Sequence, residues 1–231
     1  MPQNEVESHP YLDIQMSKAN FHHGSFTTLL LGTFPIYELT KSEPIEAAGV
    51  TKRTEWTQQA NFKFFYGSKG NSFWKILANI AGTEFPSSTE SCLKILAQQN
   101  IFIGDVIASA SRIGYSSKDQ DLTINSLNRA LQNTLDSLTS IQQIVFTSDV
   151  AKRVFTEIIG IPNARRIQTM NLNNRNISMY TLPTPAGNGR SVRRFFKDFP
   201  PTAEEIVLIE KKLPYALAYR ERLYRQFLQV I

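Results

Sequence analysis

Four short apolar runs alternate along the chain with segments in which apolar residues recur every three or four positions. The runs are rich in β-branched and aromatic residues and end in small or turn-forming residues, which is typical of buried strands. They cover residues 27–32, 101–107, 141–147 and 177–182. The recurrence of apolar residues every three or four positions predicts helices over residues 72–81, 89–99, 124–138 and 149–159.

Strands that alternate with helices predict a layered α/β domain with a mostly parallel sheet. After Pro200 and Pro201, the segment Thr202–Glu205 has the pattern of a capped helix start. We therefore expect an α/β domain over residues 1–201 and a C-terminal helical extension over residues 202–231 that packs on it.

The carboxyl ends of the expected strands carry the residues most suited to a site. In an open parallel sheet, ligands bind beyond these ends. Here the ends carry residues 32–35, Asp105, Ser148–Asp149 and residues 184–190. A pocket at this edge would be lined by two turns rich in glycine and proline and by at least one carboxylate.

Composition narrows the classes of function. The chain has 25 Lys and Arg residues against 20 Asp and Glu residues, a net charge of +5 that suits a polyanionic partner without requiring one. A single cysteine, Cys92, excludes a disulfide framework, and three histidines, all before residue 24, leave few ligands for zinc and no histidine general base in most of the chain. The first eight residues are unlike a secretion signal, and no apolar run approaches the ~20 residues of a membrane span. We expect a cytoplasmic protein with no metal, no cofactor and no membrane contact.

The first candidate site segment is Tyr66–Trp74, in which a glycine-rich turn joins aromatic residues to a helix start. Gly67 and Gly70 allow a ligand to approach the backbone closely. Asn71 could cap the helix, pair with a nucleobase edge or position a water, and the ring of Tyr66 could stack on a base. The alternative is a plain loop with a helix cap and core aromatics.

The second candidate segment is Leu182–Arg190, which leads to Arg193. Two prolines stiffen the chain as it leaves a strand, and two glycines let the tip lie against another surface. Such a loop suits phosphate contact or insertion into a duplex, and a tight surface turn is the alternative. Asp105, at the end of a buried strand, could be a helix cap, a hydrogen-bonding anchor or a functional group aimed into the pocket.

Four segments in this order resemble the uracil-DNA glycosylase superfamily, and most of all its mismatch-specific uracil-DNA and hypoxanthine-DNA glycosylase branches. Leu29–Pro35 is similar to a first motif that ends in Gly-x-x-Pro, and Tyr66–Trp74 to an aromatic-x-His-Pro-x-Asn-x-Phe-Trp block. Gly104–Ser109 is similar to the Trp-Asp-Val-Ile-Ala-Ser segment of the hypoxanthine branch, and Leu182–Arg190 to the Leu-Pro-x-Pro-Ser-Gly-x-x-Arg motif that enters the DNA minor groove. The resemblance implies a three-layer α/β/α fold with a mostly parallel four-stranded central sheet.

The resemblance also implies roles for individual residues. Asn71 and Asp105 would be catalytic. The base pocket would be formed by Gly32, Thr33, Phe34, Pro35, Tyr66, Gly67 and Thr184. DNA would be bound by Pro185, Ala186, Gly187, Asn188, Gly189, Arg190 and Arg193. The partner would be double-stranded DNA with a damaged or mismatched base, and the protein would act as a monomer. The base would leave the stack before the reaction. No metal or cofactor would be needed, because water itself attacks the sugar carbon.

Four positions depart from the family pattern. Phe34 stands where the mismatch-specific branch has an asparagine that orients the attacking water. The hypoxanthine branch also has an apolar residue at this position. In this chain, the task of orienting the water would therefore fall to Asn71 and Asp105. Ser68–Lys69 replaces His-Pro, and Thr184 replaces a His or Asn donor. Losing one pre-placed donor costs about 2.7–4 kcal/mol of transition-state stabilisation.

A non-catalytic nucleic-acid or nucleotide-binding protein is therefore the alternative to a glycosylase acting on hypoxanthine or uracil. A hydrolase of another type is disfavoured because the sequence has no Gly-x-Ser-x-Gly turn, P-loop or dinucleotide fingerprint.

Overall fold

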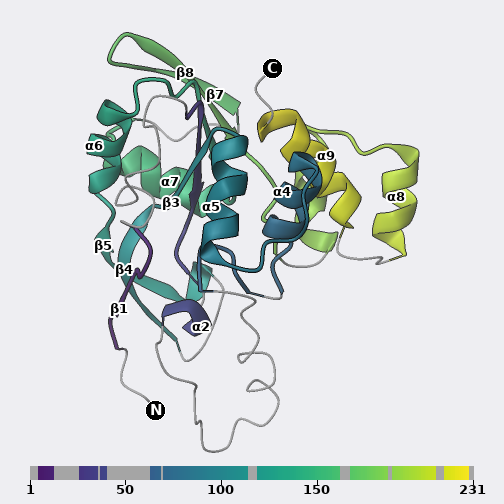
Figure 1. Ribbon diagram of the computed structural model, residues 1–231, viewed down its shortest axis with the longest axis horizontal. Coiled ribbons are helices and arrows are strands. Elements are labelled where there is room, and N and C mark those ends of the chain that lie inside the picture. Colours follow the sequence, from purple (N-terminus) through teal and green to yellow (C-terminus); the bar gives the residue numbers. More distant parts are fainter. Residues whose placement is uncertain are drawn as a thin grey trace, which may run out of the picture.

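The computed structural model describes residues 5–12, 26–35, 37–40, 63–68, 70–113, 119–161, 167–186, 189–211 and 216–228. In chain order, its elements are β1 (Glu7–Ser8), β2 (Thr28–Gly32), α2 (Tyr37–Thr40), α4 (Phe73–Ala81), α5 (Thr89–Gln98), β3 (Ile101–Asp105), β4 (Ile107–Arg112), η1 (Asp119–Asp121), β5 (Leu122–Leu127), α6 (Ala130–Ser137), β6 (Gln143–Phe146), α7 (Asp149–Ile158), β7 (Ile167–Leu172), β8 (Arg175–Thr181), η2 (Gly189–Phe195), α8 (Ala203–Glu210) and α9 (Leu217–Leu228). They build two sheets, and helices cover the larger one (Figure 1).

The larger sheet has five strands in the order β3-β2-β6-β8-β7. The pairs β2–β3, β2–β6 and β6–β8 are parallel, and these are the four strands that the apolar runs predict. The expected strand number is wrong, because β7 adds a fifth strand that runs antiparallel to β8. Asn173 and Asn174 join the two strands with φ angles of 51° and 61°, the left-handed pair that a two-residue hairpin turn requires.

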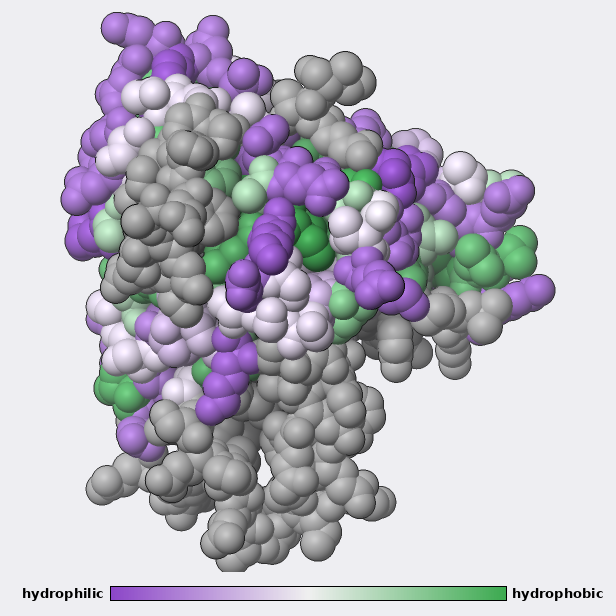
Figure 2. Space-filling view, in the orientation of Figure 1, coloured by the Kyte–Doolittle hydropathy of each residue, from purple (hydrophilic) through white to green (hydrophobic). Residues whose placement is uncertain are grey.

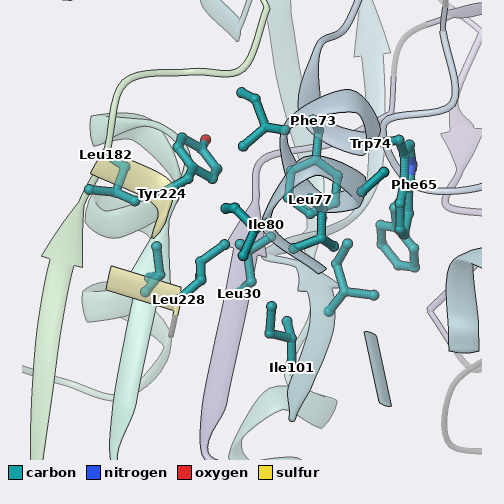
Figure 3. Packing of buried hydrophobic residues seen from close by; sticks show 14 of the residues in the cluster. Leu30, Phe65, Phe73, Trp74, Leu77, Ile80, Ile101, Leu182, Tyr224 and Leu228 are labelled. Atoms are coloured by element: carbon teal, nitrogen blue, oxygen red, sulfur yellow. The ribbon is translucent and has the colours of Figure 1, made fainter. Parts of the chain in front are cut away.

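Apolar side chains cover both faces of this sheet, since successive residues of a strand point to opposite sides. Leu30 faces a core shared with α4, α5 and α9, whereas Leu29 and Leu31 face a core shared with α6 and α7. Figure 3 shows the first core, where Leu77 of α4 and Leu228 of α9 belong to the same cluster as Leu30. The α/β class with helices on both faces of the sheet is therefore confirmed.

Three of the predicted helices are confirmed with ends that differ by no more than one residue. They are α4, α5 and α7. Ser148 caps α7 as the sequence predicts, with its Oγ accepting a hydrogen bond from the amide of Ala151 at 3.0 Å. Helix α4 ends at Ala81 and is capped by Gly82, whose φ of 66° is the left-handed conformation typical of the residue after a helix.

A second sheet, antiparallel and in the order β1-β4-β5, was not expected. β4 begins at Ile107, so the apolar run 101–107 divides between the two sheets. β5 occupies the first part of the expected helix over 124–138, and α6 begins only at Ala130. From Ile124 onward apolar residues recur at helical intervals, but main-chain pairing with β4 overrides that local pattern.

A buried ion pair holds β1 on β4. Glu7 Oε1 accepts a hydrogen bond from Arg112 Nε at 2.8 Å, and the two side chains are only 3% and 2% exposed. Arg112 Nη2 also donates to the main-chain oxygen of Pro35 at 2.8 Å, and Thr40 donates to Glu7. Because a buried charge is stable only with partners, these contacts fix residues 5–12 beside the turn that follows β2.

The C-terminal helices differ in how they are held. Thr202 and Glu205 form the predicted capping box of α8, and Glu205 Oε1 also accepts from Arg222 of α9 at 2.8 Å. Residues 206–208 remain 36–46% exposed and form an apolar surface over α8 (Figure 2). Helix α9 instead packs on α4 within the first core.

In the described part of the chain, no helix is both long and apolar enough to cross a membrane.

The Glu7–Arg112 pair allows a matched test of burial. Glu7→Gln should lower the free energy of unfolding by about 3 kcal/mol, because it replaces the carboxylate that pairs with the buried Arg112 guanidinium by a neutral amide. Glu90→Gln removes one partner of an exposed pair, whose side chains are 74% and 77% exposed, and should cost no more than about 1 kcal/mol. Urea denaturation of both variants measures the difference, and equal losses would contradict the structural role of the buried pair.

Candidate functional site

A pocket of about 110 Å³ lies at the carboxyl ends of β2, β3 and β6. This is the edge of the sheet at which the sequence predicts a site. The strand ends and the turn after β2 contribute Thr33, Phe34, Pro35, Asp105, Thr147 and Ser148 to its lining. The two candidate loops contribute Tyr66, Ser68, Asn71, Thr184 and Ala186, and Phe65 directly before the first loop also lines the pocket. Segments that are far apart in the sequence therefore meet around one cavity.

Gly32 shapes the pocket although its own atoms do not line it. It is the last residue of β2 and lies opposite Asp105 in the register of β3. A Cβ at this position would lie 2.2 Å from Asp105 Oδ1 and 2.3 Å from the Tyr66 hydroxyl oxygen. Only glycine therefore allows the carboxylate and the phenol to approach this edge together.

Asp105 is the most deeply buried acid of the pocket, with 4% of its surface exposed. Its Oδ2 lies 2.8 Å from Nε2 of His9, and its main-chain oxygen accepts from Asn128 Nδ2 at 2.9 Å. Burial raises the pKa of the Asp105 carboxyl above its ordinary value, while hydrogen bonds from His9 and from the Gly32 backbone oppose the rise. The group is thus poised to exchange a proton at higher pH than a surface aspartate.

A second carboxylate, Asp119, also lines the pocket and contacts the turn after β2. Its Oδ2 accepts a hydrogen bond from Thr33 Oγ1 at 3.1 Å. Burial raises the pKa of Asp119, the hydroxyls of Thr33 and Ser148 oppose this, and the charge of Asp105 adds to the rise. Among the described residues, no group of three or more His, Cys, Asp and Glu side chains is placed to hold a metal ion.

Tyr66 holds a strained backbone conformation at the pocket wall. Its φ of 55° lies in the left-handed region, which an aromatic residue rarely adopts. The ring packs on Phe73 with centroids 4.6 Å apart, and the hydroxyl lies 3.0 Å from Oγ1 of Thr147. Burial and the nearby charge of Asp105 raise the pKa of Tyr66 well above its ordinary value, so the pocket contains a neutral phenol.

The two candidate loops are hydrogen-bonded to each other. The amide of Ser72 donates to the main-chain oxygen of Pro185 at 3.0 Å, and Asn71 and Ala186 form an isolated antiparallel bridge. Main-chain bonds of this kind hold both loops at a fixed spacing across the pocket rim.

Helix α9 supports the second loop from the core side. The Tyr224 hydroxyl donates to the main-chain oxygen of Pro183 at 3.0 Å, and Arg220 Nη2 donates to that of Ala186 at 3.2 Å. Figure 3 shows Tyr224 between Leu182 and the α4 residue Phe73. The C-terminal helix is therefore part of the frame that positions the pocket rim.

Asn71 combines two of the roles that its sequence context left open. Its Oδ1 accepts a hydrogen bond from the amide of Phe73 at 2.9 Å and so caps the start of α4. Its side chain also lines the pocket, and Nδ2 has no hydrogen-bond partner among the described residues. A ligand in the pocket could thus accept a hydrogen bond from this amide without breaking the cap.

Three of the remaining predicted site residues, Gly67, Pro185 and Arg193, are described and do not line the pocket. Gly67 is buried, with its amide bonded to the Phe64 oxygen at 3.0 Å, and Pro185 is buried under its contact with Ser72. Arg193 is exposed on η2. Gly187 and Asn188 lie outside the described residues, as do the side chains of Gly189 and Arg190, whose backbones begin η2. The roles assigned to all these residues stay predictions.

The most important residue missed by sequence reasoning is His9. It stands 96 positions before Asp105, and no local motif connects the two. A general physical signal was present, because a carboxylate at the end of a buried strand needs a donor and the chain has only three histidines. Asp119 and Thr147 were also missed, because their places depend on η1 and on the register of β6.

The close approach at Gly32 generates a prediction about packing. Gly32→Ala should lower the free energy of unfolding by about 1–3 kcal/mol, because the added methyl group overlaps Asp105 and Tyr66. Gly104→Ala is the matched control, since its Cβ would meet Leu31 and Leu131 at 3.4 and 3.8 Å, which is ordinary contact. Thermal and urea unfolding compare the two, and a larger loss at Gly104 would contradict the geometry of the pocket.

No family model and no curated protein matches the chain. Among solved structures, the chain is similar to the solution NMR structure of "a putative Uracil DNA glycosylase" from Methanosarcina acetivorans, with 18% sequence identity and a TM-score of 0.47. The similarity covers 98% of this chain and 100% of the other. At this level the likeness assigns no role to any residue of the present chain.

Proposed function

We propose that this protein is a DNA glycosylase that excises a deaminated base, hypoxanthine or uracil, by hydrolysis of the N-glycosidic bond. The observation that carries the proposal is the pocket itself. A buried carboxylate, Asp105, and an amide donor, Asn71 Nδ2, line one cavity whose rim is made by two hydrogen-bonded loops. Ordered motifs in the sequence that resemble the uracil-DNA glycosylase superfamily support the same reaction.

In the proposed reaction, water attacks the sugar carbon C1′ while the bond between C1′ and the base nitrogen breaks. The carboxylate of Asp105 takes a proton from the attacking water as its oxygen bonds to C1′. The electron pair of the broken bond leaves with the base as an anion, which the Asn71 amide stabilises by a hydrogen bond before solvent protonates it. No metal or cofactor takes part.

The pocket rim provides the proposed contact with DNA. A base must leave the helical stack to reach a cavity of this kind, at a cost of a few kcal/mol that is smallest for a damaged or mismatched base. The loop from Pro185 to Gly189 would fill the space that the base leaves, and Arg190 and Arg193 would bind the backbone. The partner is then double-stranded DNA with a damaged or mismatched base, bound by a monomer.

A second candidate function is binding of nucleic acid or a nucleotide without turnover. Phe34 favours it, because this apolar ring lines the pocket at the position where the mismatch-specific branch orients its water with an asparagine. Salt-sensitive DNA binding without release of any base would identify this alternative.

The proposed reaction predicts abasic sites in duplex oligonucleotides that carry hypoxanthine or uracil. Asp105→Asn should lower the single-turnover rate by about 100-fold or more, because an amide cannot take the proton from water. For the wild type, the rate should fall as pH decreases through the raised pKa of Asp105, since only the ionised carboxylate acts as a base. Alkaline cleavage of the abasic product measures both effects, and absence of cleavage with any deaminated base would exclude the enzyme proposal.

Asn71→Ser tests, in the same assay, the amide donor of Asn71 separately from its side-chain oxygen, which accepts a hydrogen bond at the start of α4. Serine retains an oxygen that can accept from the Phe73 amide but has no amide donor for the leaving base. Excision should fall about 100-fold while the free energy of unfolding changes by less than about 1 kcal/mol. Unchanged excision would show that the Asn71 amide has no part in the reaction.

Two buried tyrosines of α9 test the support of the second loop. Tyr224→Phe removes the hydrogen bond to Pro183 beside the pocket, and Tyr219→Phe removes one to the main-chain oxygen of Phe199 at 2.7 Å, away from it. Each should cost about 1 kcal/mol of stability. Only Tyr224→Phe should lower the excision rate or DNA affinity, because of these two tyrosine hydrogen bonds only the one to Pro183 reaches the rim. Equal effects of both changes on excision would contradict the positioning role of α9.

A further inference from the structure

The N-terminal segment brings an imidazole into the wall of the pocket. β1 pairs with β4 at Glu7↔Ala110 and Ser8↔Ser109, and the amide of His9 then donates to the Ala108 oxygen at 2.9 Å. This pairing turns the His9 side chain toward Asp105 and leaves it fully buried, with 0% exposed. Its position is therefore set by the main chain of two strands.

Three aromatic rings enclose the imidazole. The ring centroids of Phe65, Phe34 and Tyr11 lie 5.2, 5.7 and 6.0 Å from that of His9. Phe34 and Phe65 also line the pocket. Such an enclosure excludes water from the far side of the His9–Asp105 contact and fixes the orientation of the ring.

The hydrogen bonds of the ring define its tautomer. The backbone amide of Tyr11 donates to Nδ1 of His9 at 3.1 Å, so Nδ1 is an acceptor and carries no proton. The proton of a neutral imidazole is then on Nε2, which lies 2.8 Å from Asp105 Oδ2. His9 therefore donates to the carboxylate as a neutral group, and both of its nitrogens are already engaged.

We propose that His9 is a positioning residue for Asp105: its Nε2–H holds the carboxylate in the pocket wall and stabilises its ionised form. This inference rests on the proposed function of Asp105 as the base that activates water. His9 does not itself reach a substrate, because both ring nitrogens are occupied and the ring is covered by aromatic side chains.

The other groups that face Asp105 make this donor necessary. Burial disfavours the ionised carboxylate, and Asp119 on η1 adds a like charge nearby. Tyr66, from the loop before α4, is a neutral phenol beside the carboxyl group and has Tyr224 of α9 behind it. Among the described residues, His9 and the Gly32 backbone are the groups that lower the pKa of Asp105. Loss of the His9 donor should therefore raise that pKa further.

Two substitutions separate the donor from the bulk of the ring. His9→Leu fills most of the volume and removes the hydrogen bond, whereas His9→Gln places a non-titrating amide donor near the position of Nε2. Carbon-13 NMR of the side-chain carboxyl groups, with Asp105→Asn to assign the signal, follows the titration of Asp105 without any substrate. The pKa of Asp105 should be higher in His9→Leu than in the wild type, and His9→Gln should return most of the way to the wild-type value.

The pH profile of excision should follow the same order. The acidic limb of the rate should move to higher pH in His9→Leu, with about tenfold loss of rate for each pH unit on that limb, and should be restored in His9→Gln. A titration of Asp105 that is the same in His9→Leu and in the wild type would overturn the inference, whatever the protein does to DNA. A shifted titration in a protein that cleaves no base would support the role of His9 and reject only the proposed function.

The wild-type protein provides a test that does not depend on the variants folding. Nitrogen-15 NMR of the imidazole should show His9 with a proton on Nε2 and none on Nδ1 near neutral pH. The opposite tautomer would overturn the inference, because Nε2 could then not donate to Asp105.

Discussion

Strand β2 is hydrogen-bonded on both sides by parallel strands, and the registers of these two pairings determine which residues meet at the sheet edge. Gly32 comes to lie opposite Asp105, and the chain leaving β6 brings Thr147 beside Tyr66. A side chain at Gly32 would overlap both Asp105 and Tyr66, so the pocket exists only because the central strand ends in a residue without one. The carboxylate, the phenol and the strand register thus depend on one another.

The two candidate loops are positioned by the chain around them. The loop before α4 is bonded to the loop after β8 through Ser72 and Pro185, and Tyr224 of α9 holds Pro183 from behind. Because α9 packs on α4 within the same core, a displacement of the C-terminal helix would move both sides of the rim. The polar contacts that α9 makes with the second loop explain why a tail outside every recognised motif can still be needed for the site.

Much of the fold and of the pocket could be predicted from the sequence. Buried parallel strands have a strong local signal, and their carboxyl ends are known to meet, so Asp105, Tyr66, Asn71 and Thr184 could be assigned to one cavity before the structure was known. The antiparallel sheet could not, because β1 is only two residues long and β5 is largely exposed. His9 depends on that sheet for its position. Because the sequence pattern did not predict the sheet, it could not predict that His9 is the partner of Asp105 either.

The charge of the Asp105–His9 pair suits the proposed chemistry. A protonated imidazole would make the pair neutral overall, but the Tyr11 amide occupies Nδ1, and a neutral imidazole leaves one negative charge on the pair. In the proposed reaction, positive charge develops on the sugar ring as the bond to the base breaks, and the negative charge of the buried Asp105 would stabilise it more than the same charge in water. The same charge would repel phosphate groups, so under the proposed function the contacts with DNA would be made by residues outside the pocket. The net charge of +5 and the exposed Arg193 after the second loop are consistent with a negatively charged pocket on a protein surface that carries basic residues.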